Sequence, residues 1–287
     1  MRGVVNCVAG ILLAFVEPAV PGRAEAQDSS RVDMGRAILV GTGITGTVVA
    51  VHIYQRNAWW QGPHAPFRFQ NDWSYALNID KFGHAYGAYI LAKAFSGTLS
   101  WIGFSDAASK FWGPLFGLSY QLYVEVEDGY HLIYGFSPGD AFSDVAGAAL
   151  PAAQSRFPVL ENFALKWSYY PSTEYVNDLK KGQPKAFIDD YQGQIYWLSL
   201  DPHFLFGRDL AAAVPAWLGI SFGAAVRNLD GVGNGERMFY LALDYNFRRI
   251  ETSSSFLRSA FTALDFFHLP APGIGLEGKR FTIKLVY

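Results

Sequence analysis

Three stretches of the chain carry acidic and imidazole side chains at helical spacing. The members of each pair are three or four residues apart, which places both side chains on one face of an α-helix. A carboxylate beside an imidazole can transfer a proton, and several such groups together can hold a divalent cation. The three pairs are Asp80 and His84, Glu125 and Asp128, and Asp140 and Asp144.

The surroundings of these pairs are apolar and aromatic, which restricts what the charged groups can do. An isolated buried charge is very costly, so these side chains must be paired, hydrogen-bonded or bound to a metal. The candidate catalytic residues are His84, Asp80, Lys81, Glu125, Asp128 and Asp140. The sequence leaves the cofactor open between a metal site and a metal-free acid/base site. A divalent metal is one candidate, and its candidate ligands are Asp80, His84, Glu125 and Asp128.

In a functional interpretation His84 acts as a general base or a metal ligand, Asp80 orients it or shares the metal, and Lys81 neutralises a phosphate or carboxylate of the substrate. A structural interpretation stays open beside it, in which the same groups form a buried network that fixes the helix register. Lys81 separates the two interpretations. A structural network pairs this lysine, whereas a catalytic site leaves it facing an open pocket.

Three helices are expected to carry these residues. The third begins with Ser137 as its N-cap, Pro138 at its first helical position and Asp140 in its first turn, where the helix dipole favours an anion. Pro151 predicts the end of that helix. The aromatic, proline-containing segment before the first helix is interpreted as an ordered capping loop. The expected helical ranges are 80–101, 107–127 and 138–150.

The C-terminal half shows the two-residue alternation of β-strands. A Gly/Asn/Asp turn, "NLDGVGNG", joins the alternating stretches 217–227 and 237–247, which predicts a hairpin. Two further strands are expected at 191–200 and 280–287. The predicted fold class is α+β, with an N-terminal helical bundle followed by an antiparallel β-sheet in the C-terminal half. A partial or small barrel stays open as an alternative, although single-chain barrels usually have at least about eight strands.

The N-terminus predicts export. Residues 1–26 combine a basic start, an apolar run and an AEA cleavage sequence, and are interpreted as a signal peptide. A helical domain at 27–160 and an antiparallel β region at 161–287 are expected to follow. Cys7 is the single cysteine, so the mature chain would hold no disulfide or thiolate metal site, and the early position of Cys7 argues against lipidation. The expected location is the periplasm or the outer membrane.

Composition narrows the possible partners. Lys and Arg number 23 against 25 Asp and Glu, and no basic cluster is present, which excludes a typical nucleic-acid binder. Aromatic residues make up 16% of the chain and favour contact with a membrane or lipid interface. The apolar, Gly- and Thr-rich stretch 35–55 is either a tightly packed core helix or a membrane span, and both interpretations stay open.

The ordered motifs "DKFGH", "EVEDG", "SPGD" and "DVAG" resemble the YfiM-like family, a bacterial family of unknown function described as predicted periplasmic lipoproteins. Their wider pattern is similar to that of VanZ-like membrane proteins. The resemblance covers roughly 55–205, and Asp144 stands where the VanZ-like pattern usually has Asn. The absence of a suitable lipidation cysteine departs from the lipoprotein description. The positions that the resemblance implies are Asp80, Lys81, His84, Glu125, Asp128, Asp140 and Gly147.

Two functions therefore stand side by side. The first is a metal-dependent or acid/base hydrolase that acts on an envelope lipid or a phosphorylated substrate through a three-helix Asp/His/Glu cluster. The alternative is a non-catalytic, outer-membrane-associated protein, structural or partner-binding, whose polar cluster is a buried network.

Overall fold

The computed structural model describes residues 31–182, 186–202, 214–231 and 233–287. The predicted signal peptide, including Cys7, lies outside these residues. The α-helices are α2 (Met34–Ala58), α3 (Ile79–Ile102), α4 (Asp106–Gly129), α5 (Pro138–Arg156), α6 (Thr173–Lys180) and α8 (Ser255–Leu264). The strands are β1 (Phe163–Tyr169), β2 (Gln194–Leu200), β3 (Leu218–Arg227), β4 (Glu236–Tyr245), β5 (Ala271–Glu277) and β6 (Arg280–Val286). The short 3-10 helices are η1 (Tyr75–Asn78), η2 (Pro158–Asn162), η3 (Phe187–Asp189), η4 (Tyr191–Gly193) and η6 (Phe247–Arg249).

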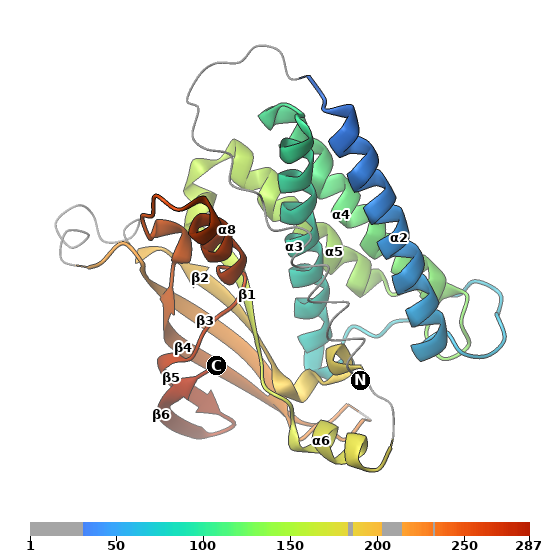
Figure 1. Cartoon of the computed structure of the whole chain (residues 1–287). Coiled ribbons are helices and arrows are strands. Elements are labelled where there is room, and N and C mark those ends of the chain that lie inside the picture. The colour runs from blue at the N-terminus through green and yellow to red at the C-terminus, as the bar shows by residue number, and fades with distance from the viewer. Residues whose placement is uncertain (1–30, 183–185, 203–213, 232) are drawn as a thin grey trace.

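The helical half is a bundle in which α3, α4 and α5 pack against one another. Figure 1 shows α3 between the other bundle helices and the sheet, with α2 along the outer side of the bundle. The α3–α5 contact is very close, because a Cβ on Gly147 would lie 2.0 Å from the carbonyl oxygen of Ala85. Only glycine permits this approach, which brings the helix that carries His84 against the helix that carries Asp144.

Helix α3 begins from a strained turn. Ala76, Leu77 and Asn78 have φ angles of 44°, 56° and 73°, a left-handed conformation that is uncommon for residues with a Cβ. Arg237 of β4 holds this turn, since its Nε donates to the Leu77 carbonyl at 3.2 Å and its Nη2 donates to Asn78 Oδ1 at 2.7 Å. The sheet therefore helps to fix the first turn of α3, which contains Asp80.

The α+β class is confirmed, and the C-terminal half is one antiparallel sheet with the strand order β1-β2-β3-β4-β5-β6. The sheet is open and is not closed into a barrel, so the barrel alternative is wrong. The expected hairpin is β3–β4, in which Leu218 pairs with Tyr245 and Arg227 with Glu236. Strands β1 and β5 were not expected. The alternating side chains of β1 include Lys166 and Ser168 at buried positions, where an apolar residue is the usual signal.

Strand β5 escapes sequence reasoning because it is rich in glycine, which is depleted in strands. A Cβ on Gly275 would lie 2.8 Å from the Tyr240 ring, so the residue leaves room for an aromatic side chain on the neighbouring strand. One end of the sheet packs on the start of the bundle through the buried side chains of Ala76, Ile79, Tyr196 and Val226.

The expected end of the third helix is wrong. Helix α5 passes through Pro151 and ends at Arg156. The turn after the proline stays ordered because Gln154 is buried and donates from Nε2 to the carbonyls of Leu160 and Phe163, at 3.1 and 2.8 Å. Tertiary contacts thus outweigh the backbone hydrogen bond that a proline removes.

Helix α2 corresponds to the apolar stretch for which a core helix and a membrane span were both open. No residue of its most apolar stretch is buried, and Met34, Ile38 and Leu39 are exposed. The core-helix interpretation is therefore wrong. Within the described residues, α2 is the one helix that has the length and composition to cross a bilayer.

Candidate functional site

A buried lysine forms the first part of the polar site. Lys81 Nζ lies 2.9 Å from Asp72 Oδ1, 2.8 Å from Asp80 Oδ2 and 2.8 Å from Asp140 Oδ1. We call these four residues the lysine cluster. Lys81 and Asp80 are buried, and Asp140 is buried as well. The ammonium group is therefore surrounded by three carboxylates and does not face an open pocket.

The pKa values in the lysine cluster are set by two opposing effects, which are burial and pairing with opposite charges. Burial works against the ammonium, but hydrogen bonds and charges from Asp140 and Asp80 outweigh it and raise the pKa of Lys81 above its ordinary value. Burial raises the pKa of Asp80 to about 6 although Lys81 opposes the shift. For Asp72, hydrogen bonds from Ser137 and Lys81 overcome burial and lower the pKa. The lysine is charged throughout the physiological range.

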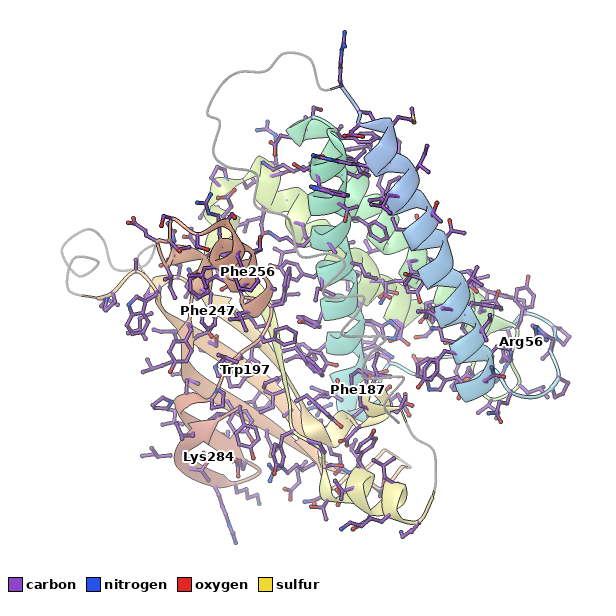
Figure 2. The ribbon with its side chains drawn as sticks, in the orientation of Figure 1. Arg56, Phe187, Trp197, Phe247, Phe256 and Lys284 are labelled. Carbon is purple, nitrogen blue, oxygen red and sulfur yellow. The ribbon has the colours of Figure 1, made fainter. Side chains whose placement is uncertain are left out.

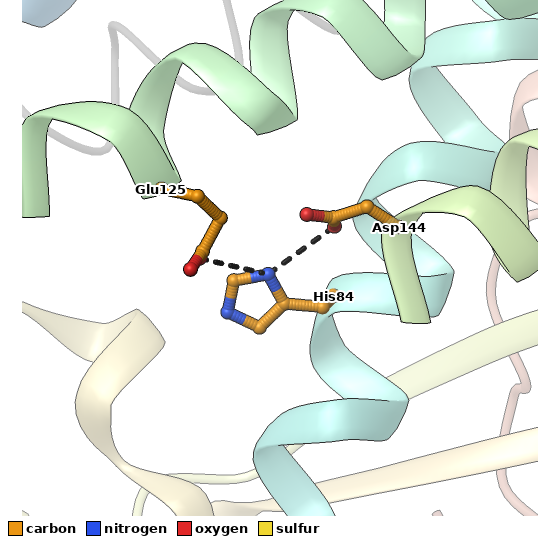
Figure 3. A group of neighbouring side chains, drawn as sticks. All are labelled: His84, Glu125 and Asp144. Carbon is orange, nitrogen blue, oxygen red and sulfur yellow. Dashed lines mark hydrogen bonds and ion pairs between the residues drawn. The ribbon is translucent and has the colours of Figure 1, made fainter. Parts of the chain in front are cut away.

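An imidazole and two carboxylates from three helices form the second part, which Figure 3 shows. His84 Nδ1 of α3 lies 3.2 Å from Asp144 Oδ1 of α5 and 3.7 Å from Glu125 Oε1 of α4. We call these three residues the histidine cluster. Asp144 is 0% exposed and Glu125 is buried, whereas the His84 side chain is 27% exposed. One member of the cluster therefore has access to solvent.

Outer hydrogen bonds and charges orient each member of the histidine cluster. Gln121 Nε2 donates to Asp144 Oδ1 at 3.0 Å, and the backbone N–H of Ser137 donates to Glu125 Oε2 at 3.1 Å. His84 Nε2, on the far side of the ring, lies 3.7 Å from Asp140 Oδ1. The ring is thus held between carboxylates on both of its nitrogens.

The pKa values of His84 and Glu125 in the histidine cluster are both raised, by negative charge for His84 and by burial for Glu125. Burial works against the imidazolium, but the hydrogen bond to Asp144 and the charges of Asp140, Asp144 and Glu125 raise the pKa of His84 to about 9. Burial raises the pKa of Glu125 to about 8, although His84 opposes it. Both groups therefore tend to keep a proton near neutral pH, which limits the negative charge of the site.

Asp140 joins the two clusters, because the same Oδ1 atom faces Lys81 Nζ and His84 Nε2. Burial raises the pKa of Asp140, and both His84 and Lys81 oppose that shift. Across the joined site five carboxyl groups face two cationic side chains. The carboxyl groups are those of Asp72, Asp80, Glu125, Asp140 and Asp144.

The predicted site residues do not all come together in one cluster. His84 and Glu125 come together, Asp140 lies beside His84, and Asp80 is turned toward Lys81. Among the described residues, Asp128 forms no hydrogen bond or ion pair with either cluster; its Oδ1 instead accepts a hydrogen bond from Trp60 Nε1 at 2.6 Å. Burial raises the pKa of Asp128 to about 6, and the Trp60 bond opposes the shift. Its predicted role as a metal ligand stays a prediction, as does that of Asp80.

Three residues of the site were not predicted as site residues. Asp72 lies in the irregular aromatic segment before α3, nine residues ahead of Lys81. Gln121 stands one turn before Glu125 on α4, and that spacing could have identified it as a neighbour. Ser137 was expected only as the N-cap of α5. It accepts from the Asp140 N–H at 3.1 Å in that role, and its hydroxyl also donates to Asp72.

A surface depression lies beside the lysine cluster and not over His84. Its lining includes Phe69, Trp73, Pro138 and Gly139. A Cβ on Gly139 would lie 2.8 Å from the Trp73 ring and 3.0 Å from Lys81 Cε, so these residues form the wall between the depression and the lysine. This hollow gives Lys81 no open access.

The fold and site define a helical bundle with a joined Lys/Asp/His/Glu centre, followed by an open antiparallel sheet. Residues 68–155, which carry the whole centre, match the sequence profile of a family described as "Predicted periplasmic lipoprotein (DUF2279)". No curated protein and no solved structure matches the chain. The family description agrees with the apolar N-terminal region, and the protein is exported to the cell envelope.

Proposed function

We propose that the histidine cluster binds a divalent cation and that the protein is a metal-dependent hydrolase of the cell envelope. One observation carries the proposal: each of the three donor groups, on His84, Glu125 and Asp144, already has an orienting partner. Ligands of protein metal sites typically have such outer partners, which fix the histidine ring and the carboxylates. The resemblance of the motif order to that of YfiM-like and VanZ-like proteins supports a common site at these positions.

The donor atoms fit a cation in number, spacing and chemistry. One atom from each of His84, Glu125 and Asp144 can be chosen so that all three lie within 4.8 Å of one another. A tetrahedral site with bonds of about 2.1 Å separates its ligand atoms by about 3.4 Å, close to the 3.2 and 3.7 Å found here. One imidazole and two carboxylates suit zinc, manganese or ferrous iron.

An unpaired oxygen supports the same conclusion. Asp144 Oδ2 is buried and has no hydrogen-bond partner among the described residues. A buried carboxylate oxygen without a partner is costly, and a cation would remove that cost. The excess of carboxyl groups over cationic side chains in the joined site also favours a bound positive charge.

The residues of the chain would divide the chemistry as follows. A divalent cation held by His84, Glu125 and Asp144 would supply Lewis-acid activation of water or of a phosphoryl or carbonyl oxygen. Asp140 holds the imidazole from its Nε2 side. Glu125, with a pKa of about 8 in the metal-free site, would give up its proton on ligating the cation, so cation binding should strengthen as pH rises. Lys81 is occupied by three carboxylates, so it organises the centre and does not contact substrate.

The substrate class follows from the setting. An exported protein with an exposed apolar helix meets lipids and phosphorylated envelope compounds, and His84 is the solvent-accessible member of the histidine cluster. We therefore propose an envelope lipid or a phosphorylated envelope substrate.

The lysine cluster favours a second candidate, a non-catalytic envelope protein. Three carboxylates around a buried ammonium make the kind of saturated network that fixes the packing of helices. In that case the histidine cluster would continue the network and would bind no ion.

Metal analysis of the purified mature protein separates the two candidates. The wild type is compared with His84→Ala and Glu125→Ala, and hydrolysis of phosphomonoester, phosphodiester and phospholipid substrates is measured in the same samples. The proposal expects a stoichiometric divalent metal in the wild type, its loss in both variants, and activity that follows the metal. A metal-free wild type, with both variants melting at much lower temperature, would favour the structural network.

A further inference from the structure

The outer face of the sheet is apolar along an entire row of paired strands. Leu198, Phe222, Leu241, Ile274 and Ile283 are neighbours across β2 to β6, each paired directly with the next. All five side chains are exposed, and Ile283 reaches 89%. Figure 2 shows side chains along the strands and labels Trp197 and Lys284, which alternate with Leu198 and Ile283 and so belong to the opposite face.

A second row continues this surface. Phe239, Leu276 and Phe281 are paired in turn across β4, β5 and β6, and all three are exposed, with Phe281 at 83%. Between these rows and the strand ends, the remaining outward positions of β3 to β6 carry no charged side chain. They are Leu218, Ile220, Leu243, Tyr245, Pro272 and Leu285, whereas Ala224 and Val226 on the same side pack against the start of the bundle. We call this surface of β2 to β6 the outer apolar face.

The opposite side of the sheet holds a buried polar network. Lys166 Nζ lies 3.0 Å from Asp244 Oδ2 and 3.2 Å from Asp265 Oδ1, and Lys166 and Asp244 are each 1% exposed. Ser221 donates to Asp244 at 2.8 Å, and Ser199 donates to the same carboxylate. The inner side of the sheet therefore buries this polar network beside an apolar cluster of Trp197, Ala225, Met238, Tyr240, Ala242 and Val286.

The one-sided sheet of a water-soluble protein exposes a polar face, whereas this sheet exposes an apolar one. Strands that contact lipid carry apolar side chains on their outward face in the same way. An apolar surface of this extent is also a recognised mark of an interaction site. The location of the protein in the cell envelope supplies a bilayer as the available apolar partner.

The ends of the strands frame the outer apolar face. At one end, Arg227 is paired with Glu236, and Arg237 follows. At the other end, Trp217 and Tyr245 stack with ring centroids 6.2 Å apart. Aromatic rings favour the level of the lipid headgroups, and charged groups favour water. This arrangement places the strand ends toward the lipid headgroups and the middle of the outer apolar face toward the acyl chains.

We propose that the outer apolar face of β2 to β6 rests against the acyl chains of a lipid bilayer at the membrane interface. The span from Phe239 to Tyr245 is about 20 Å along the strand, shorter once the strand is tilted, which is less than the roughly 30 Å hydrocarbon core. Strand β6 has no strand partner on its second edge in the described part of the chain. Unpaired backbone groups are costly in hydrocarbon, so this edge lies at the headgroups.

The surface is independent of the histidine cluster, and its test needs no metal or substrate. In a full-length Cys7→Ser background, single cysteines are introduced at outer-face positions, Ile283→Cys and Phe222→Cys, and at the exposed β5–β6 turn, Lys279→Cys. Each is labelled with an environment-sensitive fluorophore. Phosphatidylethanolamine/phosphatidylglycerol vesicles carrying nitroxide-labelled acyl chains are then added, and iodide quenching is measured in parallel.

The proposal expects a blue shift, nitroxide quenching and loss of iodide quenching for the two outer-face labels, whereas the Lys279→Cys label stays open to iodide. Outer-face labels that remain quenched by iodide in the presence of vesicles would overturn it. Protection from iodide without vesicles, together with a doubled mass in light scattering, would also overturn it in favour of a second copy of the chain. Circular dichroism confirms folding, and the pair of outer-face positions guards against a local defect at either one.

Discussion

The lysine cluster and the histidine cluster use the same kinds of side chain and share Asp140, yet their charges are completed in different ways. In the lysine cluster an ammonium within the chain contacts all three carboxylates. In the histidine cluster the cation is a titratable imidazole, and Asp144 Oδ2 has no hydrogen-bond partner in the described part of the chain. Asp80 Oδ1 of the lysine cluster also has no hydrogen-bond partner among the described residues, so the clusters differ in their cation: the first holds a permanent ammonium, whereas the second depends on a titratable imidazole.

Removal of Lys81 should produce the largest effect on stability. Lys81→Met leaves three buried carboxylates without their cation, and loss of one partner from a buried pair costs about 3–5 kcal/mol. Urea denaturation measures the change in the free energy of unfolding. Lys110→Met is the matched control, because its partner Asp106 is 80% exposed and such surface pairs contribute at most about 1 kcal/mol. Equal losses in the two variants would remove the distinction between a buried and a surface lysine.

A methyl group at Gly147 should disturb both clusters through the helix contact. Gly147→Ala places a Cβ against the carbonyl of Ala85, next to His84, and forces α3 and α5 apart. Overpacking of this kind costs about 1–3 kcal/mol. Thermal or urea unfolding checks the loss, with Ala149→Ser on the exposed side of α5 as the control. A neutral Gly147→Ala would mean that the close approach does not position the site.

Loss of an orienting partner should affect cation binding more than folding. Gln121→Met keeps the length of the side chain but removes the donor to Asp144 Oδ1. Loss of such an outer partner typically weakens metal affinity about 10–100-fold. Calorimetric titration of the metal-free protein measures it. An unchanged affinity would show that Gln121 does not orient Asp144 for cation binding.

The pH dependence of the metal-free protein should be dominated by the histidine cluster. The contribution of His84 is fully present below the ordinary pKa of 6.5 and is lost as pH rises toward about 9. The raised pKa of Glu125 acts in the same direction, because the unfolded carboxyl ionises from pH 4.5 while the folded one keeps its proton to about 8. Stability should therefore fall between pH 6.5 and 9, by at most about 1.4 kcal/mol per pH unit for each proton.

Urea midpoints at several pH values, after treatment with a chelator, check this prediction. His84→Gln should have a shallower dependence than the wild type over the same range. Identical slopes would show that other groups control the alkaline loss of stability.

The residues of the two clusters also show how much of the site could be predicted from the sequence. Helical spacing found the segments that carry Lys81, His84 and Glu125, and the Ser137–Pro138 start of α5 followed from capping chemistry. Asp72 could not be found this way, because it reaches Lys81 from an irregular segment without periodicity. Asp128 is three residues from Glu125, an angular offset of about 60° on a helix, which turns it toward Trp60.

The fold class was predictable for a similar reason. Alternating apolar residues identified β3, β4 and β6, whereas β1 carries Lys166 inside the sheet and β5 carries glycines, so neither shows the expected pattern. The division into a helical domain at 27–160 and a β region at 161–287 stays a prediction. The extra strands leave the α+β class unchanged but make an open six-stranded sheet out of the expected four strands.

The central claim is that the histidine cluster, and not the lysine cluster, accepts a divalent cation. Titration calorimetry of the metal-free wild type with zinc and manganese tests it, beside Asp144→Asn and Asp80→Asn, two substitutions that preserve shape and remove one charge. Our account predicts binding by the wild type and by Asp80→Asn, and a loss of at least about 100-fold in Asp144→Asn, since even outer partners contribute 10–100-fold. Equal affinity in wild type and Asp144→Asn, or no binding by the wild type, would contradict it.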